Sequence, residues 1–149
     1  MCTNTKGMKK LLIAGGLLLV ILVCVVSFVF GRWYQQRYIL EHEKDIAKEE
    51  PPPHNGAGMS TGYSFFANVP HLKLAFRKRV LKPGSSIGYH LQEDDEIYYI
   101  DSGKGIMKVN NDSFAVKTGD AILTRPGSSH GLQQTGNDEL VVIINYPAE

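Results

Sequence analysis

Hydrophobic and polar positions divide the chain into an apolar start, a charged middle and a long remainder of short apolar segments. Residues 11–30 read LLIAGGLLLVILVCVVSFVF, and none of these twenty positions carries a charge. An α-helix of about 20 apolar residues crosses a bilayer core, whereas a surface helix of a folded domain shows a polar face. The pattern therefore predicts one transmembrane helix over 11–30, behind a basic head at 1–10; a cleaved signal peptide is the alternative.

The charges that flank this run predict its orientation. Lys6, Lys9 and Lys10 precede it without any acid, which favours a cytoplasmic N-terminus. We therefore expect a single-pass membrane protein whose C-terminal domain is extracytoplasmic, and a cleaved signal peptide would place the domain there too. Both cysteines, Cys2 and Cys24, precede that domain, so it has no disulfide framework.

The charged middle predicts a spacer. Residues 31–50 mix charges of both signs with few apolar positions, and they suggest a solvated juxtamembrane helix. Prolines at 51–53 end any helix, because proline lacks the N–H and clashes with the preceding turn. The glycines that follow predict a flexible linker over 51–62, so the folded domain is expected over 63–149.

Short apolar segments separated by turn residues fill the rest of the chain. The segments expected as strands are Ser64–Val69, Leu72–Leu81, Ser86–Leu91, Glu96–Asp101, Gly105–Val109, Ser113–Val116, Ala121–Thr124, Gly131–Gln134 and Leu140–Tyr146. Glycine, proline, asparagine and aspartate dominate the turns between them. Many short strands at regular spacing are typical of a barrel or sandwich, so an all-β antiparallel barrel is predicted.

Side chains able to do chemistry gather in the last third of the chain. Alternate residues of a strand face the same side, so His90 and Gln92 are expected to project together. Glu96 begins the next strand, which we expect to be the hairpin partner of the His90 strand, and His130 comes from a distant segment. The four side chains could therefore converge inside the barrel, where His90 and His130 would be either metal ligands or hydrogen-bonded core histidines.

The glycine-bounded clusters that carry these residues resemble the two motifs of the cupin superfamily. The matching positions are Gly84, His90, Glu96 and Gly103 in the first motif, and Gly119, Gly127 and His130 in the second. The chain departs from the pattern at Gln92, Arg125 and Gln134, where histidine, proline and asparagine are usual. The resemblance covers residues 64–146 and implies a jelly roll, or double-stranded β-helix, that holds one metal ion and pairs into a homodimer.

The donor set indicates which metals suit this site. His90, Glu96 and His130 supply two imidazoles and a carboxylate, a set that suits Fe(II) or Mn(II) when other positions stay open. Zn(II) or Ni(II) is possible, but the three-histidine set that they would favour is incomplete. Gln92 offers a neutral amide oxygen instead, so it is expected to be a weak or outer ligand.

Two classes of function remain open. A metal enzyme acting on a small molecule would be an oxygenase, isomerase or decarboxylase, whereas a non-catalytic module would bind or sense a small ligand in the same pocket. Arg77 and Arg79 share a strand face; we expect a solvated edge strand blunted by charge, and contact with an anionic substrate is the alternative. Residues 63–149 carry nine basic and ten acidic side chains, a balance without the footprint of a nucleic-acid-binding protein.

Overall fold

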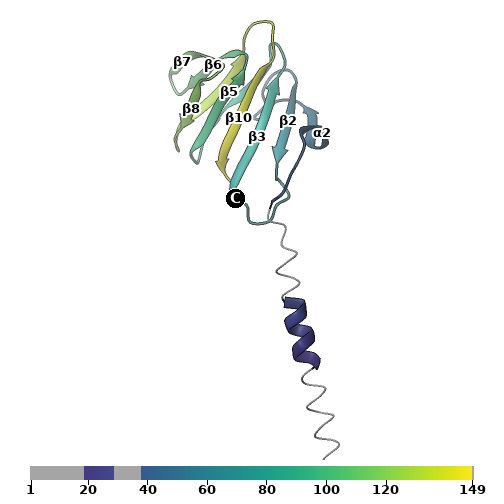
Figure 1. Cartoon of the computed structure of the whole chain (residues 1–149). Helices are drawn as coiled ribbons and strands as arrows, with labels where there is room; N and C mark the ends of the chain where they lie inside the picture. Colours follow the sequence, from purple (N-terminus) through teal and green to yellow (C-terminus); the bar gives the residue numbers. More distant parts are fainter. Residues whose placement is uncertain (1–18, 29–37, 149) are drawn as a thin grey trace, which may run out of the picture. The chain divides into compact units, whose positions relative to one another are not determined.

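The computed structural model describes residues 19–28 and 38–148 (Figure 1). The chain divides into two compact units, Met1–Ile39 and Leu40–Glu149. In the first unit, residues 19–28 form a helix, and all of its described side chains are exposed. The second unit holds the β structure and every candidate site residue.

The predicted membrane anchor is not found. Within the described residues, no helix is long and apolar enough to span a membrane. The predicted single-pass membrane location, with its extracytoplasmic domain, is therefore wrong. The head at 1–10 and the rest of the apolar run lie outside the described residues.

The second unit is built from strands. Its elements are α2 (Glu43–Ile46), β1 (Ala47–Glu50), β2 (Ser60–Phe65), β3 (Leu74–Leu81), β4 (Ser86–Leu91), β5 (Glu96–Ser102), β6 (Lys104–Val109), β7 (Asp112–Lys117), β8 (Ala121–Thr124), β9 (Ser129–Gln134) and β10 (Leu140–Pro147). Every segment expected as a strand overlaps one of these. The poorest match is β2, which ends where Phe66 takes a left-handed φ of 57° and the chain turns.

The strands form two antiparallel sheets. The larger has the order β1-β2-β3-β10-β5-β8, of which β2, β3, β10, β5 and β8 are labelled in Figure 1. The smaller has the order β4-β9-β6-β7. Residues of both sheets share one apolar core, which consists of Leu81, Ile87, Tyr98, Ile100, Met107, Val116, Leu132, Leu140, Val142 and Ile144. Along β5, Tyr98 and Ile100 face this core while Tyr99 between them is exposed, as alternation in a strand requires. The all-β antiparallel architecture is confirmed and is consistent with a jelly roll.

Residues 31–50 and 51–62 differ from the predicted spacer helix and flexible linker. The described part of the first range ends in β1, which pairs with β2, so the sheet begins before the three prolines. Ion pairing explains why so polar a segment joins a sheet, because the Glu50 carboxylate lies 2.9 Å from Nη1 of Arg79 on β3. Ser60, inside the predicted linker, is fully buried and donates to the Glu50 carbonyl at 3.0 Å.

The strands of His90 and Glu96 lie in different sheets, so the predicted hairpin between them is wrong. β4 pairs with β9, whereas β5 pairs with β10 and β8. The turn over residues 92–95 therefore carries the chain from one sheet to the other. His90 and Glu96 consequently meet between the two sheets, and not as neighbours within one.

Candidate metal centre

His90 is oriented by its own strand. The register between β4 and β9 shifts between Ile87 and His90, and such a bulge re-aims the side chains of the bulged strand. The Nδ1 of His90 lies 2.9 Å from the backbone oxygen of Gly88. Because a carbonyl only accepts hydrogen bonds, Nδ1 carries the proton in this contact. The Nε2 of His90 is thereby left with a lone pair that a metal ion can use.

Glu96 and His130 are buried together, with exposed fractions of 6% and 0%. The Nε2 of His130 lies 2.9 Å from Oε2 of Glu96. The two atoms are close, but their angle does not make a hydrogen bond. Oε2 of Glu96 therefore has no hydrogen-bond partner among the described residues. Leaving a buried polar atom unpaired costs about 1–3 kcal/mol, so such atoms are rare. A buried, unpaired carboxylate oxygen that faces an imidazole nitrogen fits a cation site.

His90, Glu96 and His130 form one cluster. A potential ligand atom from each lies within 4.8 Å of the others. Metal–ligand distances near 2.1 Å place two ligands of one ion about 3–4 Å apart, so small side-chain movements suffice to close this cluster around an ion. The residues therefore fit a divalent metal, while the identity of that metal stays a prediction.

Tyr98 adds a hydroxyl to the cluster. Its oxygen lies 3.3 Å from Nε2 of His130, and its side chain is buried two residues after Glu96 on the same face of β5. Burial and, after it, the nearby Glu96 carboxylate raise the pKa of Tyr98 well above its usual value. The hydroxyl therefore keeps its proton at neutral pH and acts as a hydrogen-bond donor.

A cavity of about 250 Å³ adjoins the cluster. Its lining includes His54, Arg77, Arg79, Gln92, Glu96 and Tyr146. A second hollow of about 470 Å³ is lined by His90 and shares His54, Arg77, Gln92 and Tyr146 with the first. Gln92 thus borders the same space as Glu96 and His90, and its role as a metal ligand stays a prediction.

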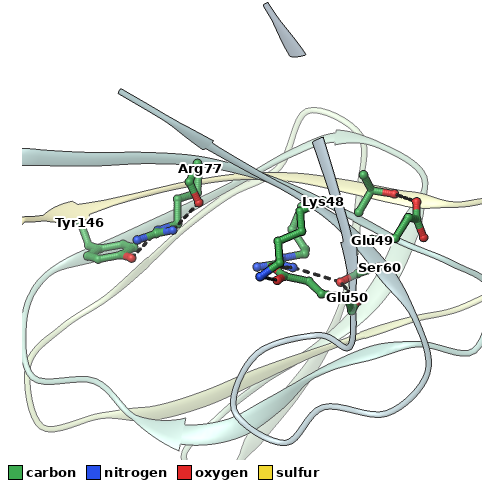
Figure 2. Close-up of polar contacts among 9 residues, drawn as sticks. Lys48, Glu49, Glu50, Ser60, Arg77 and Tyr146 are labelled. Carbon is green, nitrogen blue, oxygen red and sulfur yellow. Dashed lines mark hydrogen bonds and ion pairs between the residues drawn. The ribbon is translucent and has the colours of Figure 1, made fainter. Parts of the chain in front are cut away.

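The two arginines reach the cavity from β3. The expected solvated edge strand is wrong, because β3 is an inner strand that pairs with β2 and β10. The Nε of Arg77 donates to the hydroxyl of Tyr146 and its Nη1 donates to Oγ of Ser64, each at 2.5 Å (Figure 2). Both acceptors are neutral, so they orient the guanidinium without cancelling its charge.

The charges of Arg77 and Arg79 are balanced differently. Arg79 is paired with Glu50 at 2.9 Å. Among the residues that the structure describes, no carboxylate lies within 4.0 Å of Arg77. Arg77 therefore presents an uncompensated positive charge to the cavity, which suits an anionic ligand.

Two residues of the pocket were missed by sequence reasoning. Tyr146 follows Val142 and Ile144 at even spacing on β10, so strand parity would have placed it on the inner face. His54 lies in the predicted linker, and no spacing in the sequence points to it. Its ring stacks on that of His90 with centroids 3.4 Å apart. Loss of water contact and, next, the neighbouring His90 lower the pKa of His54.

Gln134 and Arg125, the other two departures from the motif, lie outside the cluster. Gln134 is 2% exposed; its Oε1 accepts from the N–H of Gly84 at 2.6 Å and its Nε2 donates to the carbonyl of Asp138 at 2.5 Å. Arg125 is an exposed partner of Asp95, at 2.8 Å. Gln134 therefore connects the turns at Gly84 and Asp138, and neither residue lines the two hollows described above.

We expect Gln134→Ala to destabilise the domain by about 1–3 kcal/mol, because it leaves a buried donor and a buried acceptor unpaired. Urea denaturation of the full-length chain would measure this loss. The matched control is Gln133→Ala, which removes the same side chain from an exposed neighbouring position. Equal stability losses in both variants would show that the Gln134 contacts do not matter.

Comparison with known proteins identifies the fold. Residues 78–146 match the family model of the cupin domain. An oxalate-binding protein of Thermotoga maritima is 42% identical over 66 residues, which cover 44% of this chain and 54% of that protein. An uncharacterized protein of Methanocaldococcus jannaschii is 33% identical over 78 residues, or 51% of this chain and 62% of that protein. The chain thus spans less than two thirds of the length of each relative.

Solved structures resemble this one over most of the second unit. A predicted oxalate decarboxylase of Thermotoga maritima has a TM-score of 0.68 and 29% identity, over 74% of this chain and 100% of that chain. The polyketide cyclase RemF of Streptomyces resistomycificus has a TM-score of 0.64 at 18% identity, over 75% and 80%, which shows the fold alone. Residues 78–146 thus match the cupin domain, and the two sheets and the histidine–glutamate–histidine cluster are consistent with the fold of that family.

Proposed function

We propose that this cupin domain binds a divalent metal ion and, beside it, a small carboxylate anion of the oxalate class. The observation that carries the proposal is the cluster of half-buried His90 with buried Glu96 and His130, next to the uncompensated charge of Arg77. The relative that is 42% identical is an oxalate-binding protein, which agrees with this chemistry. Mn(II) or Fe(II) suits the donor set best.

Each residue of the cluster has a distinct part in holding the ion. His90 and His130 offer neutral imidazole nitrogens, and Glu96 offers a negative charge that offsets part of the charge of the cation. Gln92 borders the same cavity and supplies an amide oxygen as a weak fourth donor. When bound, the metal would polarise a carboxylate oxygen as a Lewis acid.

Arg77 supplies the second half of anion recognition. Oxalate carries two carboxylates, so one can take the open metal positions while the other accepts hydrogen bonds from the guanidinium. A guanidinium presents a planar fork of N–H groups that matches carboxylate geometry. Because Tyr146 and Ser64 hold Arg77 in place beforehand, little side-chain entropy is lost when the anion binds.

Calorimetric titration of the full-length chain tests both parts of the proposal. We expect one Mn(II) per chain, and we expect oxalate to bind the Mn(II)-loaded chain more tightly than the metal-free chain. Acetate is the control ligand, since its single carboxylate cannot reach both the ion and Arg77. If Mn(II), Fe(II), Zn(II) and Ni(II) all fail to bind, the metal part is wrong and the pocket is an organic-ligand site.

Gln92→His is expected to tighten Mn(II) binding by roughly tenfold or more, because imidazole is a stronger ligand than a neutral amide for first-row metals. The same calorimetric titration measures the gain. Gln133→His, which adds a histidine at an exposed position away from the cluster, is the control for adventitious binding. An unchanged affinity in Gln92→His would mean that this side chain does not reach the ion.

Catalysis is the second candidate function, and the protonated hydroxyl of Tyr98 next to His130 favours it. A decarboxylase would break the carbon–carbon bond of hydrogen oxalate, release carbon dioxide and deliver a proton to the remaining carbon, which gives formate. Formate that appears with wild type and is lost in Tyr98→Phe would establish catalysis. Oxalate recovered unchanged would show that the protein is a binding module.

The homodimer implied by the resemblance stays a prediction, which light scattering would test.

A further inference from the structure

A short segment that precedes the matched cupin domain is laid along β4. This segment, residues 53–57, is called the strap below. The N–H of Gly88 donates to the carbonyl of Pro53 at 3.1 Å, and the N–H of Ser86 donates to the carbonyl of Ala57 at 2.9 Å. The N–H of Ala57 also donates to Oγ of Ser86 at 3.2 Å. Backbone bonds at both ends therefore attach the strap to the strand that carries His90.

Close approach between the strap and β4 depends on glycine. A Cβ added to Gly88 would lie 1.8 Å from the backbone oxygen of His54, and one added to Gly56 would lie 1.9 Å from the backbone oxygen of Ser86. His54 and Asn55 have left-handed φ values of 58° and 57°. Non-glycine residues keep such angles only where their surroundings impose them. The strap is thus held in one definite conformation against β4.

This conformation places the ring of His54 flat on the ring of His90. The centroids are 3.4 Å apart and the planes differ by 4°. On another side, the ring of His130 stands edge-on to His90, with a centroid distance of 4.5 Å and an interplanar angle of 67°. Gly88 connects His90 to the strap. Its carbonyl accepts a hydrogen bond from Nδ1–H of His90, and its N–H donates to the carbonyl of Pro53.

Parallel stacking argues against His54 as a ligand of the same ion. An ion bound by an imidazole nitrogen lies in the plane of that ring. Because the two ring planes are parallel and separated, an ion in the plane of His90 lies outside the plane of His54. His54 accordingly is not a member of the cluster whose ligand atoms come within 4.8 Å of one another.

We propose that His54 is a positioning residue of the metal site, which through its stacked ring and the strap keeps His90 turned towards Glu96 and His130. The inference rests on the proposed metal function. The stacking contact explains how a site without a third histidine keeps its two imidazoles preorganised. A ring of similar size can perform this task without a nitrogen, which separates positioning from ligation.

Three variants of the full-length chain test the proposal by titration with Mn(II). His54→Asn removes the ring while asparagine tolerates the left-handed φ, and we expect Mn(II) affinity to fall roughly threefold to tenfold, the size of a lost aromatic contact. His54→Phe keeps a flat ring and is expected to restore most of that affinity. His71→Asn is the matched control, because His71 is exposed, has a φ of 62° and lies outside the cluster.

Each outcome separates the alternatives. Affinity lost equally in His54→Asn and His54→Phe would show that the nitrogen matters and would overturn positioning in favour of ligation. Affinity unchanged in His54→Asn would remove His54 from the site altogether. A metal-free readout is the imidazole ¹⁵N spectrum, in which His90 should stay in the Nδ1–H form in wild type and lose that preference in His54→Asn. If wild type binds no metal while this spectrum changes as expected, the proposed function fails and the positioning contact stands.

Discussion

Mn(II) is expected to bind Glu96→Gln at least about 100-fold more weakly than it binds wild type. Glutamine keeps the shape of the side chain but removes the charged donor, and two imidazoles alone make a poor site for a hard cation. The binding free energy of a structural zinc ion is about 10–16 kcal/mol, or roughly 3 kcal/mol for each of its four ligands. Losing one ligand therefore costs about a factor of 100 in affinity, which corresponds to about 2.7 kcal/mol. Calorimetry on the full-length chain, with anaerobic conditions for Fe(II), measures the loss.

The control for this experiment is Glu139→Gln. It makes the same chemical change at an exposed acid that lies outside the cluster, so its Mn(II) affinity should match wild type. Thermal melting of both variants checks that the fold survives, because Glu96 is buried. If Glu96→Gln binds Mn(II) as tightly as wild type while Glu139→Gln does too, the ion is not held by Glu96 and the proposed centre is in the wrong place.

Oxalate is expected to bind Arg77→Gln about tenfold to a hundredfold more weakly than wild type when both chains are loaded with Mn(II). A hydrogen bond to a charged group contributes about 1.5–3 kcal/mol, and Arg77 has no carboxylate partner among the described residues that would already use its charge. Affinity for Mn(II) itself should change little, since Arg77 is not part of the ligand cluster. Titration of oxalate into each Mn(II)-loaded chain gives the comparison.

Two further variants separate recognition by Arg77 from net charge. Arg125→Gln removes one positive charge at an exposed position that pairs with Asp95, so oxalate should bind it as it binds wild type. Arg77→Lys keeps the charge but loses the planar fork, so an intermediate affinity is expected. Equal losses in Arg77→Gln and Arg125→Gln would show that only the overall charge matters, and the assigned anion contact would then be wrong.

Local signals in the sequence were enough to predict the strands and part of the site. Turn residues bound β4 and β8 at the residues where the structure has them, because proline, glycine and aspartate interrupt an extended chain wherever it folds. Strand parity predicted that His90 and Gln92 share one side; β4 ends at Leu91, yet both residues line the same hollow. Glu96 and His130 were predicted from the resemblance to the two cupin motifs.

Pairing between distant strands was decided by the tertiary structure. A four-residue turn such as 92–95 joins a hairpin and a crossing between sheets equally well, so its sequence does not say which sheet β5 enters. The apolar core settles this by burying β5 beside β10, with Tyr98 and Ile144 inside. The same sheet makes β3 an inner strand, which turns Arg77 from a surface charge into a residue of the pocket.

Composition alone misjudged the segments before the barrel. Charged residues such as those at 47–50, and glycines such as those after the prolines, are typical of segments without regular structure. Such a segment adopts a fixed conformation only when it pairs with another part of the protein. Arg79 is that partner for Glu50, and β4 is the partner for the strap. His54 and His90 are 36 positions apart in the chain, and their stacking depends on contacts that no local pattern encodes. Sequence thus predicted the strands and the residues of the histidine–glutamate–histidine cluster, whereas folding decided what surrounds them, because those contacts are long-range.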